Sequence, residues 1–342
     1  MSAPRRVLLV CPGRGSYGRR QLGCLPTADP IIRQLDAYRT RLGRPTLSEL
    51  DRAERFISSQ HMAGEHASLL TFGATAVDLA ALDPAKARIV AVTGNSMGWY
   101  TALYAAGALG LADAARLIET MGAWQAQDEH GVIGGQVMLP TVGEDWRPDP
   151  VLQARVAEAL THAHVHLSIR LGGTTVLGAS RDGVRWLLDE LPKQRRGSRE
   201  FPLQLPLHSA FHTPLLAATS ARAIRELGDL PLRPPAHPLF AGDGRSFRAW
   251  ADPFEVLDYT LGHQVVAPYD LTLAVQTAVG THAPELLVLP GPGDTLGAPV
   301  AQILIAMGWR GLRDRADFDE AQGSDAPLIA AMARPAQRAW VA

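Results

Sequence analysis

Three short apolar runs, each followed at once by glycine-rich sequence, constrain the fold of this chain more than any other feature. They are residues 7–10, 88–93 and 286–289. Continuous apolar runs of this length are typical of strands that are buried on both faces. Stretches with helical character, residues 71–81 and 97–106, lie between the runs. The alternation predicts an α/β fold with a parallel sheet.

The middle of the chain predicts a second, smaller unit. Its expected strands are residues 135–139, 165–170 and 174–177, and its expected helices are residues 148–162 and 182–191. This order of strands and helices is typical of a small α+β unit. We therefore expect residues 132–202 to form an insert in a large α/β domain, which residues 1–131 and 203–342 form together.

The composition excludes some classes of partner. Of the 342 residues, 46% are hydrophobic, which is enough for a full core, and the formal net charge is -1. A charge this small gives no general attraction for nucleic acid. The apolar stretch at residues 299–309 is too short to span a membrane. We expect a monomer that binds neither nucleic acid nor a membrane.

The cysteine content favours a reducing compartment. The chain has two cysteines, Cys11 and Cys24. They form neither a disulfide framework nor a four-ligand zinc site. The N-terminal apolar run is shorter than the apolar region of a secretory signal, and proline and glycine follow it directly. We expect a cytoplasmic protein.

The segment Gly94-Asn95-Ser96-Met97-Gly98 has the pattern G-x-S-x-G between an expected strand and an expected helix. In that context the pattern predicts a nucleophile elbow, in which a sharp turn exposes the serine hydroxyl. The N–H of Met97 and the dipole of the following helix can then stabilise an oxyanion. Ser96 is the candidate nucleophile.

A serine hydroxyl needs a base to become an effective nucleophile. Among the 11 histidines, His208 and His212 lie in an apolar segment, residues 206–214, that ends in a proline. The apolar neighbours indicate partly buried imidazoles beside a chain reversal. The local sequence leaves open whether either imidazole is a base or a structural residue.

Further motifs occur in an order that resembles malonyl-CoA:acyl-carrier-protein transacylases and polyketide synthase acyltransferase domains. Residues 12–17 resemble their P-G-Q-G-S-Q opening, residues 94–100 their G-H-S-x-G-E-Y elbow, residues 105–118 the helix pair that follows, residues 211–216 their F-H-S-P-L-M segment, Gln264 and Pro268 their Q-L-x-x-P segment, and residues 291–293 their late G-P-G. Together these motifs are far more specific than any one of them.

The resemblance implies a hydrolase-like large domain with a ferredoxin-like insert. It also implies a catalytic dyad of Ser96 and His212, with the imidazole oriented by the main-chain carbonyl of Gln264. The main-chain N–H groups of Arg14 and Met97 would form the oxyanion hole. The implied reaction moves an acyl group from CoA, through an acyl-serine, to the phosphopantetheine arm of an acyl carrier protein in fatty acid or polyketide biosynthesis. No metal or bound cofactor is expected, because acyl-CoA is a substrate.

Three positions of the expected acyl pocket depart from the family pattern. The elbow histidine is Asn95, the elbow glutamate is Trp99, and the arginine that clamps the malonyl carboxylate is Met121. A buried carboxylate needs a charge partner, which methionine cannot provide. We therefore expect an uncharged acyl donor, unless Arg14 or Arg170 replaces the missing arginine.

Phe211, the fourth expected pocket residue, belongs to a segment that indicates a malonyl donor instead of an uncharged one. Ser209-Ala210-Phe211-His212 resembles the H-A-F-H form that accompanies malonyl use in polyketide synthases. Met121 also lies at helical spacing from Leu117 and Ile118, as an ordinary core residue would. The sequence therefore leaves the acyl group open.

A local basic run is a candidate docking site for the carrier protein. It contains Lys193, Arg195, Arg196 and Arg199 at the end of the insert. Runs of this kind are commonly solvated loops, but carrier proteins are acidic, and in the resembled family the insert borders the entrance of the active site. The run therefore predicts a docking surface.

Three alternating histidines, His162, His164 and His166, would share one face of a strand. Three imidazoles could bind zinc, but no acidic or cysteine ligand is obvious nearby. We interpret them as a solvated strand face.

Other functions are compatible with the same motifs. If water replaced the carrier thiol, the chain would be a hydrolase that clears acyl groups from carrier proteins. A patatin-like lipase pairs its serine with an aspartate, for which Asp182 and Asp243 are candidates because each precedes a glycine. A non-catalytic module that binds carrier proteins is a third possibility, against which the presence of both Ser96 and His212 argues.

Overall fold

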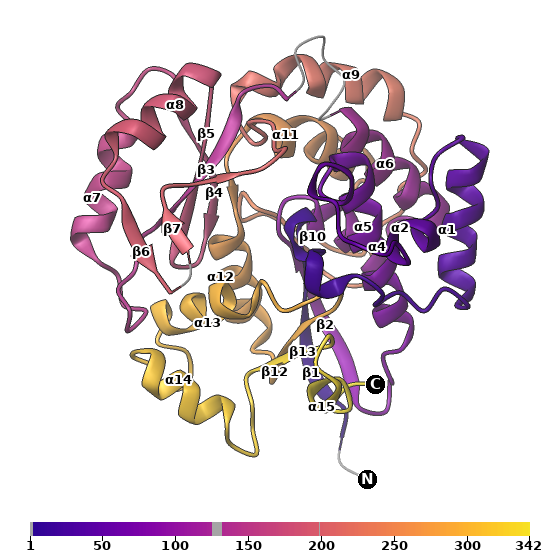
Figure 1. Ribbon diagram of the computed structural model, residues 1–342. Helices are drawn as coiled ribbons and strands as arrows, with labels where there is room; N and C mark the ends of the chain where they lie inside the picture. The colour runs from indigo at the N-terminus through magenta and orange to yellow at the C-terminus, as the bar shows by residue number, and fades with distance from the viewer. Residues whose placement is uncertain (1–2, 125–131, 198) are drawn as a thin grey trace.

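A six-stranded sheet forms the centre of the larger part of the molecule (Figure 1). The computed structural model describes residues 3–124, 132–197 and 199–342. Neighbouring strands are parallel, except for the antiparallel pair at one edge. In sheet order the strands are β10 (Ser246–Phe247), β9 (Leu239–Phe240), β2 (Ala87–Gly94), β1 (Arg5–Cys11), β12 (Leu286–Leu289) and β13 (Ile329–Ala331).

The three apolar runs of the sequence form adjacent strands, β2, β1 and β12, in this sheet. Their side chains are the core of the domain, and residues 7–10 are fully buried. Parallel strands place their carboxyl ends at one edge, so the glycine-rich segments after them meet there. The Asn95 N–H, for example, donates a hydrogen bond to the carbonyl of Cys11 at 2.9 Å.

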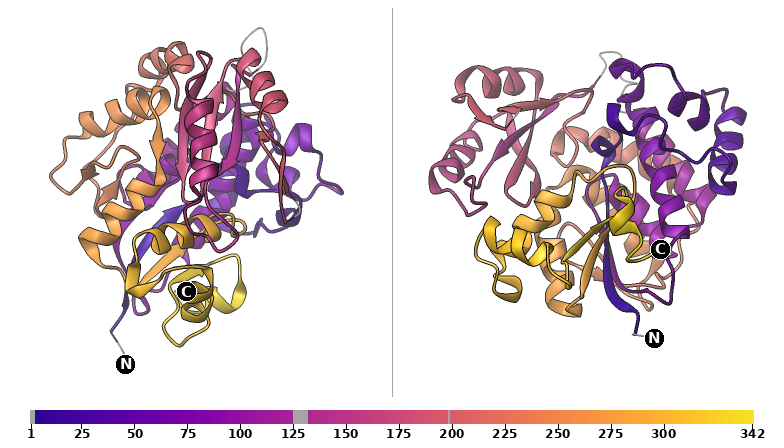
Figure 2. Two further views of the ribbon diagram at one scale, coloured as in Figure 1. Left: turned by 90° about the vertical axis from the view of Figure 1, so that its left-hand side faces the viewer. Right: turned by 60° about the horizontal axis from the view of Figure 1, so that its bottom comes forward.

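Helices surround this sheet (Figure 2). Helices α5 (Gly98–Ala105) and α12 (Leu271–His282) contact β1 and β2. Helix α4 (Gly64–Ala80) packs on α6 (Leu111–Ala123), and their approach is close, because a Cβ on Gly122 would lie 2.5 Å from the carbonyl oxygen of Gly64. The other helices are α1 (Pro30–Arg41), α2 (Leu47–Asp51), α3 (Ser58–His61), α9 (Ala217–Leu227), α10 (Pro253–Asp258), α11 (Gln264–Val266), α13 (Gly297–Ala306), α14 (Arg315–Gln322) and α15 (Pro335–Arg338). Within the described residues, no helix has the length and apolar character needed to cross a bilayer.

A five-stranded sheet forms the smaller part, on the left of Figure 1. In sheet order its strands are β11 (Tyr269–Asp270), β4 (Val165–Leu171), β5 (Thr174–Ala179), β3 (Gly135–Pro140) and β8 (Leu203–Leu205). Helices α7 (Pro150–Ala159) and α8 (Arg181–Glu190) belong to the same unit. The chain order β3-α7-β4-β5-α8-β8 is that of a ferredoxin-like unit.

The small sheet extends past the segment in which the sequence indicated strands. Strand β8 begins at residue 203, and β11 comes from residues 269–270 and pairs with β4. Both strands are too short for their hydrophobic pattern to identify them. A hairpin of β6 (Gln194–Arg196) and β7 (Arg199–Phe201) precedes β8.

Helix α4 begins at Gly64, well before the expected start near residue 71. Its first turn is polar in sequence, yet His66 in that turn is buried. The burial is tolerated because His66 Nδ1 has a polar partner, the guanidinium of Arg39, at 2.8 Å. Arg39 is itself fully buried and forms a 2.7 Å ion pair with Glu119 of α6. This network lets charged residues lie between three helices.

Candidate active site

Ser96 lies at the sharp turn between β2 and α5, as the G-x-S-x-G pattern predicts. Its φ is +55°, a left-handed conformation that costs a serine about 1–3 kcal/mol and is common at functional sites. The two glycines permit the turn. A Cβ on Gly94 would lie 2.1 Å from the carbonyl oxygen of Gly98, and one on Gly98 would lie 2.3 Å from that of Cys11.

The hydroxyl of Ser96 meets the imidazole of His212. Ser96 Oγ lies 2.7 Å from His212 Nε2, and His212 Nδ1 lies 2.5 Å from the main-chain carbonyl oxygen of Gln264. Since a carbonyl only accepts, Nδ1 carries the proton and Nε2 is free to accept the serine proton. His212 also has a left-handed φ of +62°, and its N–H donates to the carbonyl of Val265 at 2.8 Å.

Burial keeps the imidazole of His212 in its basic form. The side chain is fully buried, and desolvation lowers its pKa to about 4, although the hydrogen bond to the Gln264 carbonyl acts in the opposite direction. At neutral pH the imidazole is therefore uncharged and can take up a proton.

Tyr100 and Tyr269, for which the sequence predicted no role, support the Ser96–His212 pair together with the side chain of Gln264. The side chain of Gln264 donates from Nε2 to the carbonyl of Ser96 at 3.2 Å and accepts from the hydroxyl of Tyr100 at 3.1 Å. Tyr269 donates from its hydroxyl to the carbonyl of Gly94, and its ring centroid lies 5.4 Å from that of His212. Tyr100 falls within the elbow motif, whereas no local signal identifies Tyr269.

The two expected oxyanion donors lie on neighbouring loops. Arg14 begins a short 3-10 helix, η1 (Arg14–Ser16), after β1, and Met97 precedes α5. The loops touch, because a Cβ on Gly13 would lie 3.0 Å from the carbonyl oxygen of Asn95. Within the described part of the chain, no acceptor takes the N–H of Met97. This geometry is suitable for binding an oxyanion beside Ser96.

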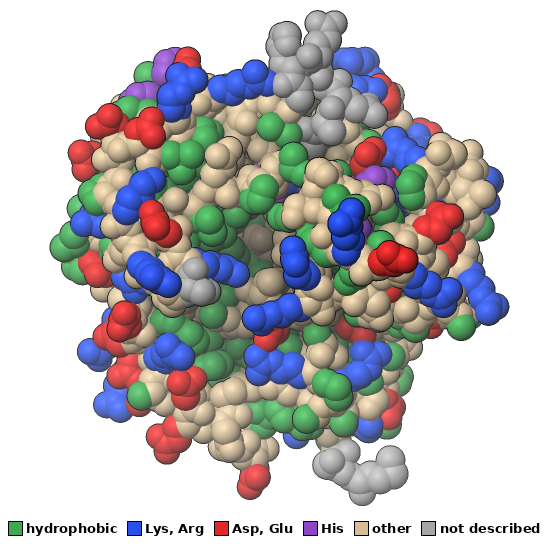
Figure 3. Space-filling model, in the orientation of Figure 1, with side chains coloured by type: hydrophobic (Ala, Val, Ile, Leu, Met, Phe, Trp, Pro, Cys, Tyr) green, Lys and Arg blue, Asp and Glu red, His purple; other side chains and the backbone are tan. Residues whose placement is uncertain are grey.

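Ser96 and His212 line a cavity of about 600 Å³ between the two parts of the molecule. Figure 3 shows a hollow near the centre of this face, with Lys and Arg side chains around it. Three of the four expected pocket residues, Asn95, Met121 and Phe211, line the cavity.

Trp99, the remaining expected pocket residue, does not line the cavity, and that expectation was wrong. It is fully buried, its Nε1–H donates to Thr260 Oγ1 at 2.9 Å, and its ring packs edge-on against Tyr259 at 5.0 Å between centroids. Its neighbour Tyr100 lines the cavity, whereas Trp99 is directed to Tyr259 and Thr260 in the interior of the large domain.

Of the two arginines considered as a replacement clamp, Arg14 lines the cavity and Arg170 does not. The side chain of Arg14 is buried and donates to the carbonyl of Leu207 at 2.6 Å, and desolvation lowers its pKa. Arg170 is exposed and lies 3.5 Å from Asp270.

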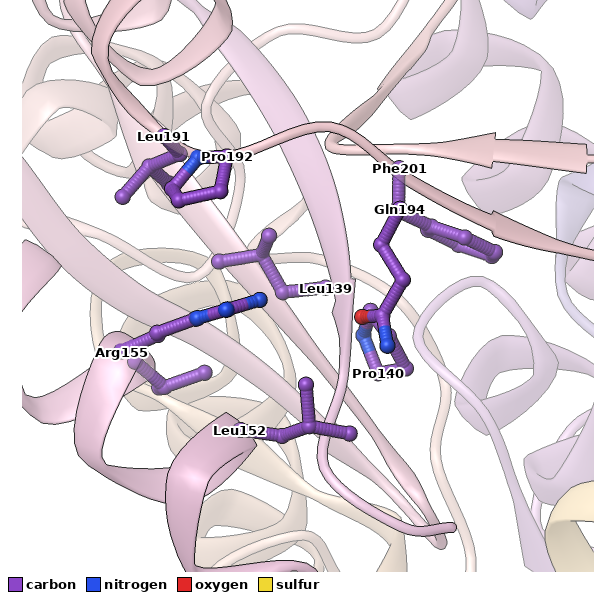
Figure 4. Close-up of a pocket in the computed structure, with 9 residues that line it drawn as sticks. Leu139, Pro140, Leu152, Arg155, Leu191, Pro192, Gln194 and Phe201 are labelled. Atoms are coloured by element: carbon purple, nitrogen blue, oxygen red, sulfur yellow. The ribbon is translucent and has the colours of Figure 1, made fainter. Parts of the chain in front are cut away.

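The basic run lies on the β6–β7 hairpin and just before it. Lys193, Arg195 and Arg199 are exposed, Arg196 is half-buried, and Arg199 lines the cavity. The hairpin covers a small recess over α7 (Figure 4), of about 10 Å³, which is room for roughly one water molecule. The recess is therefore too small to hold a substrate.

Among the described residues, His212 is the histidine candidate that is bonded to Ser96 Oγ. His162 and His164 precede β4, so the three alternating histidines do not share a strand, and His162 stacks on Trp186 at 4.4 Å. The described residues contain no group of three His, Cys, Asp or Glu side chains that could hold a metal ion. His208 lines the same cavity, but its Nδ1 lies 2.9 Å from Gln136 Oε1, and the imidazole bonded to Ser96 Oγ is that of His212.

Neither candidate aspartate of a lipase-like dyad lines the cavity that contains Ser96. Asp182 is exposed and pairs with Arg185 at 3.2 Å, and Asp243 pairs with Arg245 at 2.6 Å. The partner of Ser96 Oγ is an imidazole.

Solved structures share this fold across nearly the whole chain. The malonyl-CoA:ACP transacylase of Synechocystis sp. PCC 6803 matches with a TM-score of 0.74 and 16% identity over 98% of this chain and 99% of that one. The corresponding transacylase of Xanthomonas oryzae pv. oryzae matches with a TM-score of 0.71 and 21% identity over 99% and 98%. The acyltransferase domain of an iterative polyketide synthase in enediyne biosynthesis matches with a TM-score of 0.59 and 20% identity over 97% and 66%.

These likenesses confirm the expected fold class, a hydrolase-like α/β domain with a small ferredoxin-like subdomain. No protein-family model matches the sequence, and no curated protein sequence is significantly similar to it.

Proposed function

We propose that this chain is an acyltransferase that moves an acyl group from CoA to an acyl carrier protein through an acyl-serine on Ser96. The observation that carries the proposal is the continuous hydrogen-bonded series from Ser96 Oγ through His212 to the Gln264 carbonyl at the wall of a large cavity. The shared fold of the transacylases supports the same conclusion.

The loading step follows from the geometry. His212 Nε2 takes the proton of the Ser96 hydroxyl as Oγ attacks the thioester carbonyl. The N–H groups of Arg14 and Met97 stabilise the oxyanion. When the tetrahedral intermediate collapses, the C–S bond breaks, the imidazolium returns its proton to the CoA thiolate, and the acyl-serine remains.

The transfer step repeats the chemistry in the opposite sense. The thiol of the phosphopantetheine arm gives its proton to His212 Nε2 and attacks the acyl-serine carbonyl. Ser96 leaves with the proton from the imidazolium, and the acyl group remains on the carrier protein. The reaction balances without a metal ion or a bound redox cofactor.

We further propose that the acyl donor is uncharged. Met121 occupies the cavity wall at the position that the clamping arginine holds in the resembled family, and its side chain is 2% exposed. A carboxylate placed against Met121 would lose its hydration without gaining a charge partner there, since the guanidinium of Arg14, also at the cavity wall, is bonded to the carbonyl of Leu207.

The basic side chains of the β6–β7 hairpin are proposed to dock the carrier protein, since the hairpin reaches the cavity through Arg199. An acidic partner bound there could place its phosphopantetheine arm in the cavity.

Intact-mass spectrometry tests the proposed function directly. The protein is incubated with a panel of acyl-CoA donors, and we expect the mass of one acyl group to be added to the wild type but not to Ser96→Ala. Addition of a carrier protein bearing its phosphopantetheine arm should then discharge the acyl-enzyme onto the carrier. Release as the free acid at the same rate with and without carrier would identify a hydrolase. If no donor acylated Ser96, the proposal would be wrong.

A further inference from the structure

The small sheet has two faces, and both are apolar. One face contributes Val137 and Leu177 to a separate core cluster, where they pack with Leu187 of α8. The opposite face carries alternate residues of the same strands and lines the cavity of Ser96. Its aliphatic side chains are Met138, Ile169, Leu171, Val176, Leu203 and Leu205.

This face carries more apolar surface than a polar substrate would need. Met138, Leu171, Leu203 and Leu205 are only half-buried, so part of their surface is open to the cavity. The wall that the larger part contributes is mixed, because Met62, Ile118 and Met121 belong to it together with polar residues such as Ser68 and Asn95. Apolar surface of this extent is typical of a site for an apolar ligand.

The face begins at the dyad and leads away from it. Gly178 of β5 lies next to the residue after His212, since a Cβ there would be 2.5 Å from Thr213 Cγ2. The next residues of β5 on this face are Val176 and Thr174, which line the cavity. From residue 178 to residue 174 a strand rises about 13 Å, which gives room for an extended acyl chain.

The far end of this path is polar. Beyond Thr174, the N–H of Gly173 donates to Gln302 Oε1 at 2.9 Å, and Gln302 lies on α13 at the cavity wall. The amides of a phosphopantetheine arm can bind to polar groups, which this face has at its two ends in Gln136 and Thr174, whereas the aliphatic side chains between these ends offer none. The apolar surface is therefore better matched to the acyl group than to the arm.

We propose that Ser96 accepts unbranched aliphatic acyl groups of medium length, and that the chain lies on the cavity face of the small sheet, across Val176 and Met138. This inference rests on the proposed acyltransferase function and adds the substrate class. Val176 and Leu171 are then residues that determine chain-length specificity, because they lie along the path.

The test compares kcat/KM for acylation of Ser96 by acetyl-CoA, octanoyl-CoA and decanoyl-CoA. Each methylene that the sheet face removes from water should raise kcat/KM roughly fourfold, so octanoyl-CoA should exceed acetyl-CoA by at least about tenfold. Val176→Trp, which fills the path, should lower the decanoyl-to-acetyl ratio of kcat/KM at least about tenfold.

Two further variants make the comparison decisive. Leu171→Trp places the same side chain at a half-buried cavity position and should lower the ratio even if Val176→Trp does not fold. Val151→Trp is the matched control, because Val151 is 62% exposed on α7, outside the cavity, and should leave the ratio as in the wild type.

Two results would overturn the inference while leaving the acyltransferase function intact. One is acylation by acetyl-CoA as fast as by decanoyl-CoA, and the other is an unchanged ratio in both cavity variants. Failure of every donor to acylate Ser96 would overturn the proposed function and this inference with it.

Discussion

Gln264 binds both members of the dyad. Its main-chain carbonyl oxygen lies 2.5 Å from His212 Nδ1, and its side-chain amide donates to the carbonyl of Ser96 at 3.2 Å. One residue therefore fixes the tautomer of the imidazole and the turn that presents the hydroxyl.

Replacement of Gln264 by Leu separates these two roles. The variant keeps the main-chain carbonyl but loses the bonds to Ser96 and Tyr100, so kcat for acylation should fall about 3- to 10-fold, the effect of one or two neutral hydrogen bonds. The pH dependence should not change, because the orientation of His212 is retained. A loss as complete as that of Ser96→Ala, in a folded variant, would contradict this role.

The pH dependence of acylation should reflect the buried imidazole. Since desolvation lowers the pKa of His212 to about 4, the base is uncharged above that pH, and kcat/KM should stay level from neutral pH to about pH 5. It should fall only as the pH approaches the lowered pKa. An acid limb near pH 6.5, the ordinary range of histidine, would show that the base is not buried as described.

The lowered pKa of His212 also makes the free energy of unfolding depend on pH. Between about pH 6.5 and 4 the unfolded chain binds the proton of His212 and the folded chain does not, so the free energy of unfolding should fall as the pH falls through this range. Rates at low pH are therefore measured on samples whose folding is verified by circular dichroism.

The elbow glycines should be intolerant of a methyl group. In Gly98→Ala the new Cβ would lie 2.3 Å from the carbonyl oxygen of Cys11, and we expect a loss of at least about 3 kcal/mol in unfolding free energy. Gly280→Ala is the control, since this exposed glycine of α12 has no atom within 4 Å of the added Cβ. That variant should gain about 0.5–1 kcal/mol. Chemical denaturation measures both, and equal effects would contradict the steric argument.

An arginine at Met121 should change donor preference. Met121→Arg places a guanidinium in the cavity wall, and a hydrogen bond between charged groups is strong enough to raise the malonyl-to-acetyl ratio of kcat/KM at least about tenfold. Intact-mass kinetics with both donors measures the ratio, and thermal unfolding shows whether the variant is folded. Faster acylation by malonyl-CoA than by acetyl-CoA in the wild type would refute the proposal of an uncharged donor.

Charge reversal on the hairpin should affect only the second half-reaction. In the double variant Arg195→Glu, Arg196→Glu, KM for the carrier protein should rise several-fold at low salt, and the difference should shrink as salt screens the charges. Acylation by acyl-CoA should proceed as in the wild type. The same substitution at Arg185 on α8, which is not part of the basic run, serves as a control, and an equal rise there would exclude a specific docking surface.

The central strands could be predicted from sequence because they are long enough to carry their own signal. Residues 7–10 and 286–289 lie inside β1 and β12 and are apolar because they are buried throughout, and residues 88–93 lie inside β2, whose second half is buried. Strands β8 and β11 could not, because two or three residues have no period and become strands only by pairing with a neighbour.

The prediction of the candidate site residues used two kinds of information. The position of Ser96 followed from local pattern, whereas the pairing with His212, which lies 116 residues later, came from the resemblance and not from any physical signal in the segment. The error at Trp99 has a tertiary cause, because its side chain is buried against Tyr259 and Thr260, in a segment that nothing in the elbow motif indicates.

Strand β11 has a consequence for protein engineering. Tyr269 pairs with Ile169 in the small sheet, while its hydroxyl is bonded to the carbonyl of Gly94 at the elbow. A chimera that exchanged only residues 132–202 would import three of the five strands and would rely on the host for the other two. The unit that can be transplanted between relatives therefore has to include residues 203–205 and 269–270, and any such graft also replaces a tyrosine that supports the nucleophile.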